Sequence, residues 1–146
     1  MSDVFVVSTD RASVDVDLVH RWLSTQSYWA PGIPRETVQR SIDNSLCFSG
    51  LLVGRQVAFA RVVTDFATFA YLADVFVLDE VRGRGYGMQL MDAVFAYPQL
   101  QGLRRFMLAT RDAHALYARY GFTPPVKPAS LMERYAPDVY VMPKPD

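Results

Sequence analysis

Apolar residues in the first third of the chain predict one strand followed by two helices. Residues 4–8 (VFVVS) form a short apolar run typical of a strand. Asp15 is placed to cap a first helix, and Pro34 to begin a second one after the break at residues 31–34 (PGIP). Three-to-four-residue spacing then predicts the buried positions: Leu18, Val19, Trp22 and Leu23 in the first helix, and Val38, Ile42 and Leu46 in the second.

The middle of the chain is rich in predicted strands. Residues 48–53 and 56–64 flank Gly54-Arg55, which we interpret as a hairpin turn. The next run, residues 69–78 (FAYLADVFVL), is too continuously apolar for a strand with one solvated face, so it predicts a central strand buried on both faces. Asp74 is conspicuous because it interrupts this apolar strand.

The last part of the chain alternates helix and strand again. A glycine-rich turn leads into a helix, residues 103–109 predict a strand, and Thr110 or Asp112 is placed to cap another helix that Gly121 ends. Residues 139–142 predict a last strand. The inward positions of the two helices are Met88, Leu90, Met91, Val94 and Phe95, then Ala113, Leu116, Tyr117 and Tyr120. We therefore expect an α/β fold, a mixed sheet flanked by helices, in a single domain spanning residues 1–146.

Composition and charge exclude several classes of protein. Of the 146 residues, 51% are hydrophobic, which excludes intrinsic disorder. Fifteen basic and fifteen acidic residues balance to a net charge of +0, so no nucleic-acid partner is expected. No leader or membrane segment is visible, and Cys47 is the single cysteine, so a cytoplasmic protein is expected. With two histidines and one cysteine, no metal site is expected.

The most specific local signal is the run at residues 82–87 (RGRGYG), between the buried strand and a helix. Alternate glycines allow a tight turn, and amides at a helix N-terminus favour an anion such as a phosphate. The spacing fits neither the GxxxxGK[ST] nucleotide loop nor the GxGxxG dinucleotide fingerprint. A purely structural strand-to-helix connection is the alternative.

At this point the chain resembles the GNAT superfamily of N-acyltransferases. Residues 82–87 match its acyl-CoA signature [QR]-x-x-G-x-[GA], and residues 113–122 (AHALYARYGF) look like its A-x-x-L-Y-x-x-x-G-F helix and following strand. The resemblance implies the GNAT-like fold with acetyl-CoA as the acyl donor. It also implies direct transfer to a primary amine in a ternary complex, and we expect a small-molecule or amino-acid-like acceptor.

The resemblance also implies roles for individual residues. Tyr117 matches the family's general acid. Asp74 is the only carboxylate in the central strand and is a candidate general base, the alternatives being a structural carboxylate paired with backbone amides or an arginine, or a water chain; His114 is a weaker candidate. Thr110 stands where family members often have an asparagine that holds the pantetheine arm. The expected cofactor-binding residues are Val75, Val77, Arg82, Gly83, Arg84, Gly85, Tyr86, Gly87 and Thr110.

Two questions stay open at this level. Tyr28 and Trp29, between the first two helices, form either an aromatic wall for the acceptor or an anchor for their loop. The residues after Phe122 serve either a homodimer contact or the completion of the sheet. A rival function is a non-catalytic acyl-CoA-binding module, which would keep the loop and lack turnover.

Overall fold

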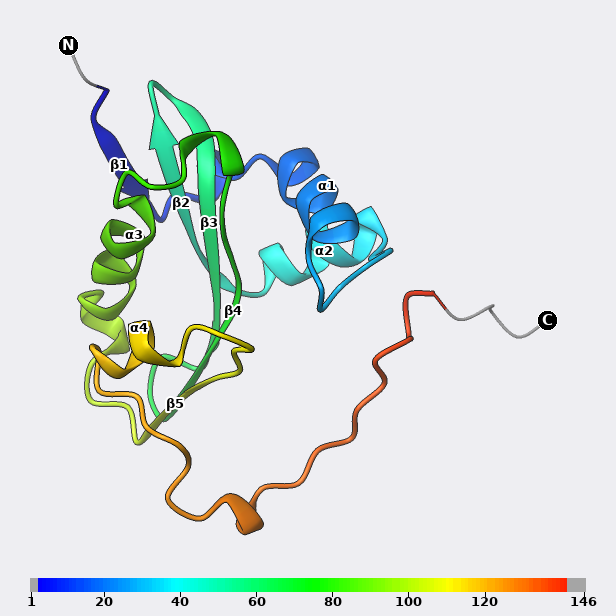
Figure 1. Cartoon of the computed structure of the whole chain (residues 1–146), viewed down its shortest axis with the longest axis vertical. Coiled ribbons are helices and arrows are strands. Elements are labelled where there is room, and N and C mark those ends of the chain that lie inside the picture. Colours follow the sequence, from blue (N-terminus) through cyan, green and yellow to red (C-terminus); the bar gives the residue numbers. More distant parts are fainter. Residues whose placement is uncertain (1–2, 142–146) are drawn as a thin grey trace.

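The centre of the structure is a five-stranded mixed sheet (Figure 1). In the computed structural model, which describes residues 3–141, the strands lie side by side in chain order. Neighbouring strands are antiparallel except β4 and β5, which are parallel. The strands are β1 (Phe5–Ser8), β2 (Leu46–Leu52), β3 (Arg55–Thr64), β4 (Phe69–Val77) and β5 (Arg105–Leu108). The mixed sheet expected from the sequence is confirmed.

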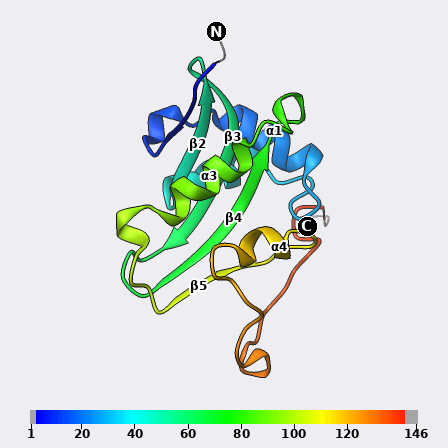
Figure 2. The same cartoon turned by 60° about the vertical axis from the view of Figure 1, so that its left-hand side comes forward.

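Helices cover both faces of this sheet (Figures 1 and 2). Helices α1 (Val16–Gln26) and α2 (Arg35–Asp43) pack on the face that presents Cys47, Phe59 and Phe76. Helices α3 (Tyr86–Phe95) and α4 (His114–Ala118) pack on the opposite face, against Ala58 and Leu72. Short 3-10 turns occupy Arg11–Ser13, Asp79–Val81, Pro98–Leu100 and Pro128–Ser130. The sheet therefore has a separate apolar core on each face.

The predicted caps and buried positions agree with this arrangement in most places. Asp15 caps α1 by accepting a hydrogen bond from the Leu18 amide at 3.1 Å. Val19 and Leu23 of α1, and Val38 and Ile42 of α2, are buried as their spacing predicts. β4 is buried or half-buried from residue 70 to residue 77, as expected of a strand covered on both faces.

Two local predictions are wrong, and the structure decides a third that was left open. The residues that connect the β2–β3 hairpin are Val53 and Gly54, because a two-residue turn with φ of +50° and +75° matches the twist of the strands. Leu46 begins β2 instead of extending the second helix, since α2 ends at Asp43. Thr110, not Asp112, accepts the hydrogen bond of the amide that precedes α4, from Ala113 at 3.0 Å.

The C-terminal segment also departs from the prediction. No strand follows Phe122 in the part of the chain that the structure describes, and residues 139–141 form a turn; Met142 lies outside the described residues. The amides of Val139 and Val141 donate to the carbonyls of Ala136 and Asp138, at 3.3 Å and 3.0 Å. These local bonds use the donors that a sheet ladder would need. Between residues 3 and 141, no helix is long and apolar enough to span a bilayer.

Candidate active site

Strands β4 and β5 separate part of the way along β4. They pair in parallel only from Phe69 and Arg105 to Leu72 and Leu108, whereas β4 continues to Val77. Beyond Leu72, no described strand lies on the β5 side of β4. The backbone groups on that side of β4 are therefore open to another extended molecule.

A β-bulge in β4 marks the point of separation. Phe59 of β3 pairs with Phe76, whereas Arg61 pairs with Ala73, so Ala60 faces both Asp74 and Val75. Asp74 has a left-handed backbone with φ of +55°. Such a bulge increases the local twist and bends the strand that contains it. We attribute the divergence of β4 from β5 to this bulge.

The alternation of hydrogen bonds along an antiparallel pair shows to which side of β4 the amide and carbonyl groups point beyond the bulge. The Leu78 amide donates to the Val57 carbonyl at 2.9 Å, so Leu78 and Phe76 face β3. Val77 and Val75 consequently direct their amide and carbonyl groups away from β3, towards the opening between the strands. The Val77 carbonyl accepts a hydrogen bond from Arg82 Nε at 3.2 Å.

The start of α3 is a cluster of backbone donors directly after β4. Gly85 caps the helix with φ of +82°, and Gly83 has φ of +81°, conformations that L side chains rarely adopt. Among the described residues, no group accepts a hydrogen bond from the amides of residues 83–88. Arg84 is exposed beside them, whereas Arg82 forms a 3.0 Å ion pair with Asp79. These amides and the helix dipole make a site for an anion.

Packing holds the first turn of α3 against the rest of the sheet. The Tyr86 ring stacks on Phe5 of β1, with ring centroids 4.4 Å apart. Gly50 leaves room for Phe5, because a Cβ at Gly50 would lie 2.5 Å from the Phe5 ring. Tyr86 thus fixes the glycine turn through its side chain, while its amide remains one of the free donors.

Tyr117 lies in α4 on the α3 face of the sheet, with 8% of its surface exposed. Burial, and to a smaller extent the neighbouring Tyr28, raise the pKa of its hydroxyl above the ordinary value of 10.0. Within the described part of the chain, the hydroxyl makes no hydrogen bond. It therefore keeps its proton at neutral pH and has that proton available for donation.

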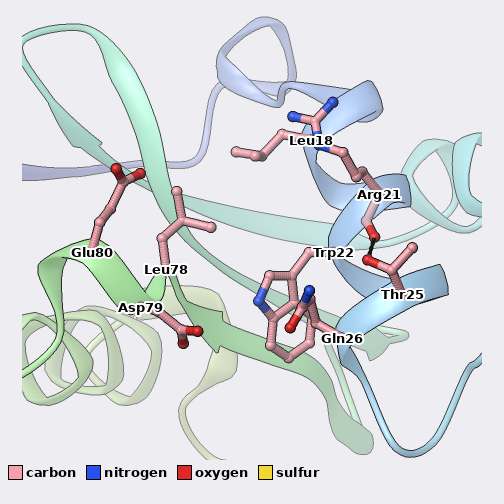
Figure 3. A pocket seen from close by; sticks show the side chains of 8 residues that line it. All are labelled: Leu18, Arg21, Trp22, Thr25, Gln26, Leu78, Asp79 and Glu80. Atoms are coloured by element: carbon pink, nitrogen blue, oxygen red, sulfur yellow. Dashed lines mark hydrogen bonds between the residues drawn. The ribbon is translucent and has the colours of Figure 1, made fainter.

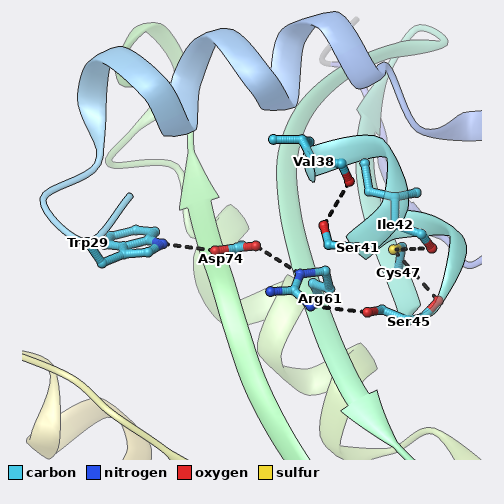
Figure 4. Close-up of polar contacts among 8 residues, drawn as sticks. All are labelled: Trp29, Val38, Ser41, Ile42, Ser45, Cys47, Arg61 and Asp74. Atoms are coloured by element: carbon cyan, nitrogen blue, oxygen red, sulfur yellow. Dashed lines mark hydrogen bonds and ion pairs between the residues drawn. The ribbon is translucent and has the colours of Figure 1, made fainter. Parts of the chain in front are cut away.

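Asp74 is held by two donors from different elements (Figure 4). Its Oδ1 accepts a hydrogen bond from Trp29 Nε1, and its Oδ2 accepts one from Arg61 Nε, both at 2.8 Å. Arg61 in turn donates from Nη1 to the Ser45 hydroxyl at 3.1 Å. Since both carboxylate oxygens have a partner, this arrangement matches the structural alternative considered for Asp74, with an arginine as the partner.

The loop between α1 and α2 contacts β4 and the segment that follows β5. Trp29 is joined to Asp74 of β4, and the Arg111 guanidinium lies 4.0 Å from the centre of the Tyr28 ring. The Tyr28 and Trp29 rings meet edge to face with centroids 5.0 Å apart. Both rings also stay partly exposed, so they anchor their loop and still present a surface to solvent.

A groove of about 380 Å³ lies beside this loop, between α1 and the end of β4 (Figure 3). Trp22 lines it and lies 5.6 Å from Trp29, centroid to centroid, which connects the groove to the loop. Its polar groups include Arg21 and Gln26 on one side and two carboxylates, Asp79 and Glu80, on the other. Glu80 is paired with Arg55 at 2.8 Å, as Asp79 is with Arg82.

Sequence reasoning missed Arg61, Arg111 and the groove. A signal for Arg61 was present, because it interrupts the apolar strand β3 just as Asp74 interrupts β4, and opposite charges inside two neighbouring strands favour a pair. Arg111 had no such signal. His114, the weaker candidate base, is exposed on α4.

Comparison with known proteins agrees with this geometry. The model of the Acetyltransferase (GNAT) family matches residues 16–122. A presumed acetyltransferase of Gibberella zeae is 32% identical over 139 residues, covering 79% of this chain and 76% of that protein. This chain therefore belongs to the GNAT acetyltransferase family, as its motifs indicate.

Solved structures show the same fold. The crystal structure of a presumed GNAT acetyltransferase from Xanthomonas campestris pv. campestris superposes with a TM-score of 0.93 at 65% identity, covering 95% of this chain and 98% of that one. An acetyltransferase assigned in Clostridium acetobutylicum, crystallised with acetyl-CoA, superposes with a TM-score of 0.67 at 16% identity, covering 92% and 96%. At that identity the second likeness concerns the fold alone.

Proposed function

We propose that this protein is an N-acetyltransferase that moves an acetyl group from acetyl-CoA to a primary amine of a small, amino-acid-like acceptor. The observation behind the proposal is the alignment of two open sets of backbone groups: the β5 side of β4 beyond Leu72, and the amides of residues 83–88 directly after it. A ligand made of an extended arm followed by a pyrophosphate would use the groups of β4 for its arm and the amides after β4 for its pyrophosphate.

The residues present fit coenzyme A. Amides at the N-terminus of α3, together with Arg84, suit a pyrophosphate, and the groups of Val75 and Val77 suit the amides of a pantetheine arm. Thr110 lies after β5 and retains a hydroxyl that can donate to the same arm. Acetyl-CoA supplies the acetyl group as an activated thioester. Open backbone donors of β4 are available to a carbonyl oxygen on which negative charge develops.

Three proton movements accompany acetyl transfer: the ammonium loses one proton before attack, the departing thiolate gains one from Tyr117, and the second proton that the nitrogen loses as the amide forms returns to the Tyr117 oxygen. The Tyr117 hydroxyl is protonated at neutral pH, and no described residue accepts its hydrogen bond, so it can give its proton to the departing thiolate. For the proton that the acceptor ammonium must lose, we propose a water chain as its recipient. Asp74 remains the candidate side chain, but it would have to release Arg61 or Trp29 before it could accept that proton.

The groove beside α1 supports a small acceptor. Its volume of about 380 Å³ is at the lower end of the range for small-molecule sites. Arg21 on one wall suits an acidic group of the acceptor, whereas Asp79 and Glu80 on the other wall could receive its amine only in competition with Arg82 and Arg55. Trp22, Trp29 and Tyr28 lead from this groove towards Tyr117, which gives the acceptor an apolar surface along the way.

The first experiment is thermal unfolding with and without acetyl-CoA, with adenosine as the ligand control. A ligand at a hundred times its dissociation constant stabilises by about 2.7 kcal/mol, which for this chain corresponds to a rise of roughly 5–10 °C. We expect that rise with acetyl-CoA and not with adenosine. Release of free thiol from acetyl-CoA in the presence of small amines then measures turnover.

A pair of variants localises the effect. Gly85 and Gly102 both have positive φ and open space where a Cβ would stand, so alanine strains the backbone similarly in each. We expect Gly85→Ala to lose the stabilisation by acetyl-CoA and Gly102→Ala to keep it. No stabilisation of the native protein would contradict acetyl-CoA binding, and stabilisation without turnover would favour the non-catalytic module.

A further inference from the structure

Residues 123–141 form an extended arm whose side chains are all exposed. Every described residue from 123 to 141 is exposed, and the arm runs from below α4 back towards the loop between α1 and α2 (Figure 1). Met132 is 97% exposed, Val126 93% and Tyr135 73%. The large apolar residues exposed on this arm are Val126, Leu131, Met132, Tyr135, Val139, Tyr140 and Val141.

The residues at the start of the arm explain why the chain leads away from the body of the protein there. Phe122 is anchored among aromatic rings, with centroids 5.3 Å from Phe95 and 5.6 Å from Phe106. Pro124 and Pro125 follow, and successive prolines favour an extended backbone that leads the chain outwards. The arm approaches the body of the protein again at its end, where Tyr140 and Val141 lie next to Gly32.

The sheet of the same chain has a free edge that matches such an arm. β5 is the last strand of the sheet, and no described strand pairs with its outer side. The stretch between Pro128 and Pro137 contains no proline, and residues 131–136 (LMERYA) are neither helix nor turn. The Leu131 amide donates to the Pro128 carbonyl at 3.1 Å, whereas no described residue accepts a hydrogen bond from the amides of residues 132–136. An extended segment with free amides and an unpaired strand edge are the two halves of a β-augmentation.

We propose that the arm, residues 123–141, packs on a second copy of this chain and adds residues 131–136 to the outer edge of the copy's β5. A two-fold exchange covers both arms and both free edges at once, because each copy offers the same two surfaces. The arm together with the surface that it covers reaches the ~20–30 residues per partner found in stable interfaces. A net charge of +0 adds no repulsion between the copies.

The oligomeric state of the full chain tests this directly. Sedimentation velocity should give twice the chain mass of 16.5 kDa. We expect the double variant Met132→Asp/Tyr135→Asp to raise the dissociation constant of the dimer at least about a hundredfold, since each carboxylate would be buried without a partner. The variant should stay folded by circular dichroism, because both side chains are exposed in the single chain. Val53→Asp, at an exposed apolar site in the β2–β3 turn, is the matched control and should remain dimeric.

Hydrogen exchange gives a second readout on the unaltered protein. Amides of residues 131–136 and of β5 should be protected in the native chain and should exchange rapidly in the double variant. A native chain that sediments as a monomer would overturn the proposal. So would a double variant that stays dimeric, a Val53→Asp variant that becomes monomeric, or unprotected amides at residues 131–136.

Discussion

Two tyrosines of one short segment differ in what their hydroxyls do. The Tyr120 hydroxyl donates to Asp92 Oδ1 of α3 at 2.7 Å, and burial together with this carboxylate raises its pKa to about 12. Tyr117 is more deeply buried, and its hydroxyl makes no hydrogen bond to the described residues. Tyr120 therefore ties the segment after α4 to α3, whereas the Tyr117 hydroxyl is unbonded among the described residues.

This difference predicts opposite outcomes for two matched substitutions. Tyr117→Phe should lower kcat for acetyl transfer by about 10²-fold or more, the usual contribution of a general acid, and should leave acetyl-CoA affinity unchanged. Tyr120→Phe removes a hydroxyl from the same region and should keep kcat, with a loss of about 1 kcal/mol of stability from the missing hydrogen bond. Steady-state kinetics and thermal unfolding of both variants measure this. Full turnover in Tyr117→Phe would refute its assignment as the acid.

The direction of the Tyr117 pKa also fixes the sign of a pH effect. Because the folded state raises this pKa above 10.0, the folded chain holds the proton more tightly than the unfolded chain does. The resulting stability is fully present below pH 10 and is lost as the pH rises through the folded pKa. Tyr117, the proposed acid, should accordingly stay protonated throughout the neutral range.

At the scale of elements, a loop, a bulge and two strands depend on one another. The bulge turns the Asp74 carboxylate towards the α1–α2 loop, Arg61 of β3 holds it in place, and Trp29 attaches the loop to it.

Before the start of β4, Asp65 accepts hydrogen bonds from the amides of residues 67–69 and from the Thr68 hydroxyl. These bonds lower the pKa of its carboxyl well below the usual range. The Thr68 carbonyl of the same segment accepts hydrogen bonds from the amides of Arg104 and Arg105, so β4 and β5 start together before they diverge.

We therefore predict that Trp29→Phe and Asp74→Asn act through the acceptor loop. Each should raise KM for the acceptor by about tenfold, the cost of a lost hydrogen bond to a charged group, with a smaller effect on kcat and none on the stabilisation by acetyl-CoA. The double variant should be no worse than Asp74→Asn alone, because Asp74→Asn weakens the contacts to both Trp29 and Arg61, whereas Trp29→Phe removes only the first of them. A kcat that collapses in Asp74→Asn but not in Trp29→Phe would identify Asp74 as the base instead.

At the scale of the whole molecule, the sheet separates the two candidate binding surfaces, one on each of its faces. The amides of α3 and the Tyr117 helix lie with the core of one face, and the groove beside α1 lies with the core of the other. The two surfaces thus lie on different faces, which would let the proposed donor and the proposed acceptor bind together. Cys47, the single cysteine, is 5% exposed on the α1 side, and burial raises the pKa of its thiol to about 11. It is therefore a poor nucleophile at neutral pH.

This arrangement predicts sequential kinetics without an acetylated enzyme. Double-reciprocal plots at several acceptor concentrations should intersect, and Cys47→Ala should retain kcat. Mass spectrometry of the protein incubated with acetyl-CoA alone should find no added acetyl group on a cysteine. Parallel plots, or an acetyl group on Cys47, would contradict direct transfer.

The sequence alone determined the order of elements, the cap of α1, the glycine turn before α3 and the family, because each depends on residues close to one another along the chain. Apolar spacing, turn residues and short motifs act within a few positions. The same local information failed at the Val53-Gly54 turn, where strand twist selects the two residues with positive φ, and after Phe122, where no described strand forms.

Only the tertiary structure decided what Asp74 does and how the sheet opens. Its partners Arg61 and Trp29 are 13 and 45 residues away, and its left-handed backbone results from a register shift between β3 and β4. Register is set by the packing of both faces of the sheet, which no short stretch of sequence contains. The fold also decided that β5 ends early and that the arm beyond Phe122 stays exposed, because pairing depends on which strands meet in space.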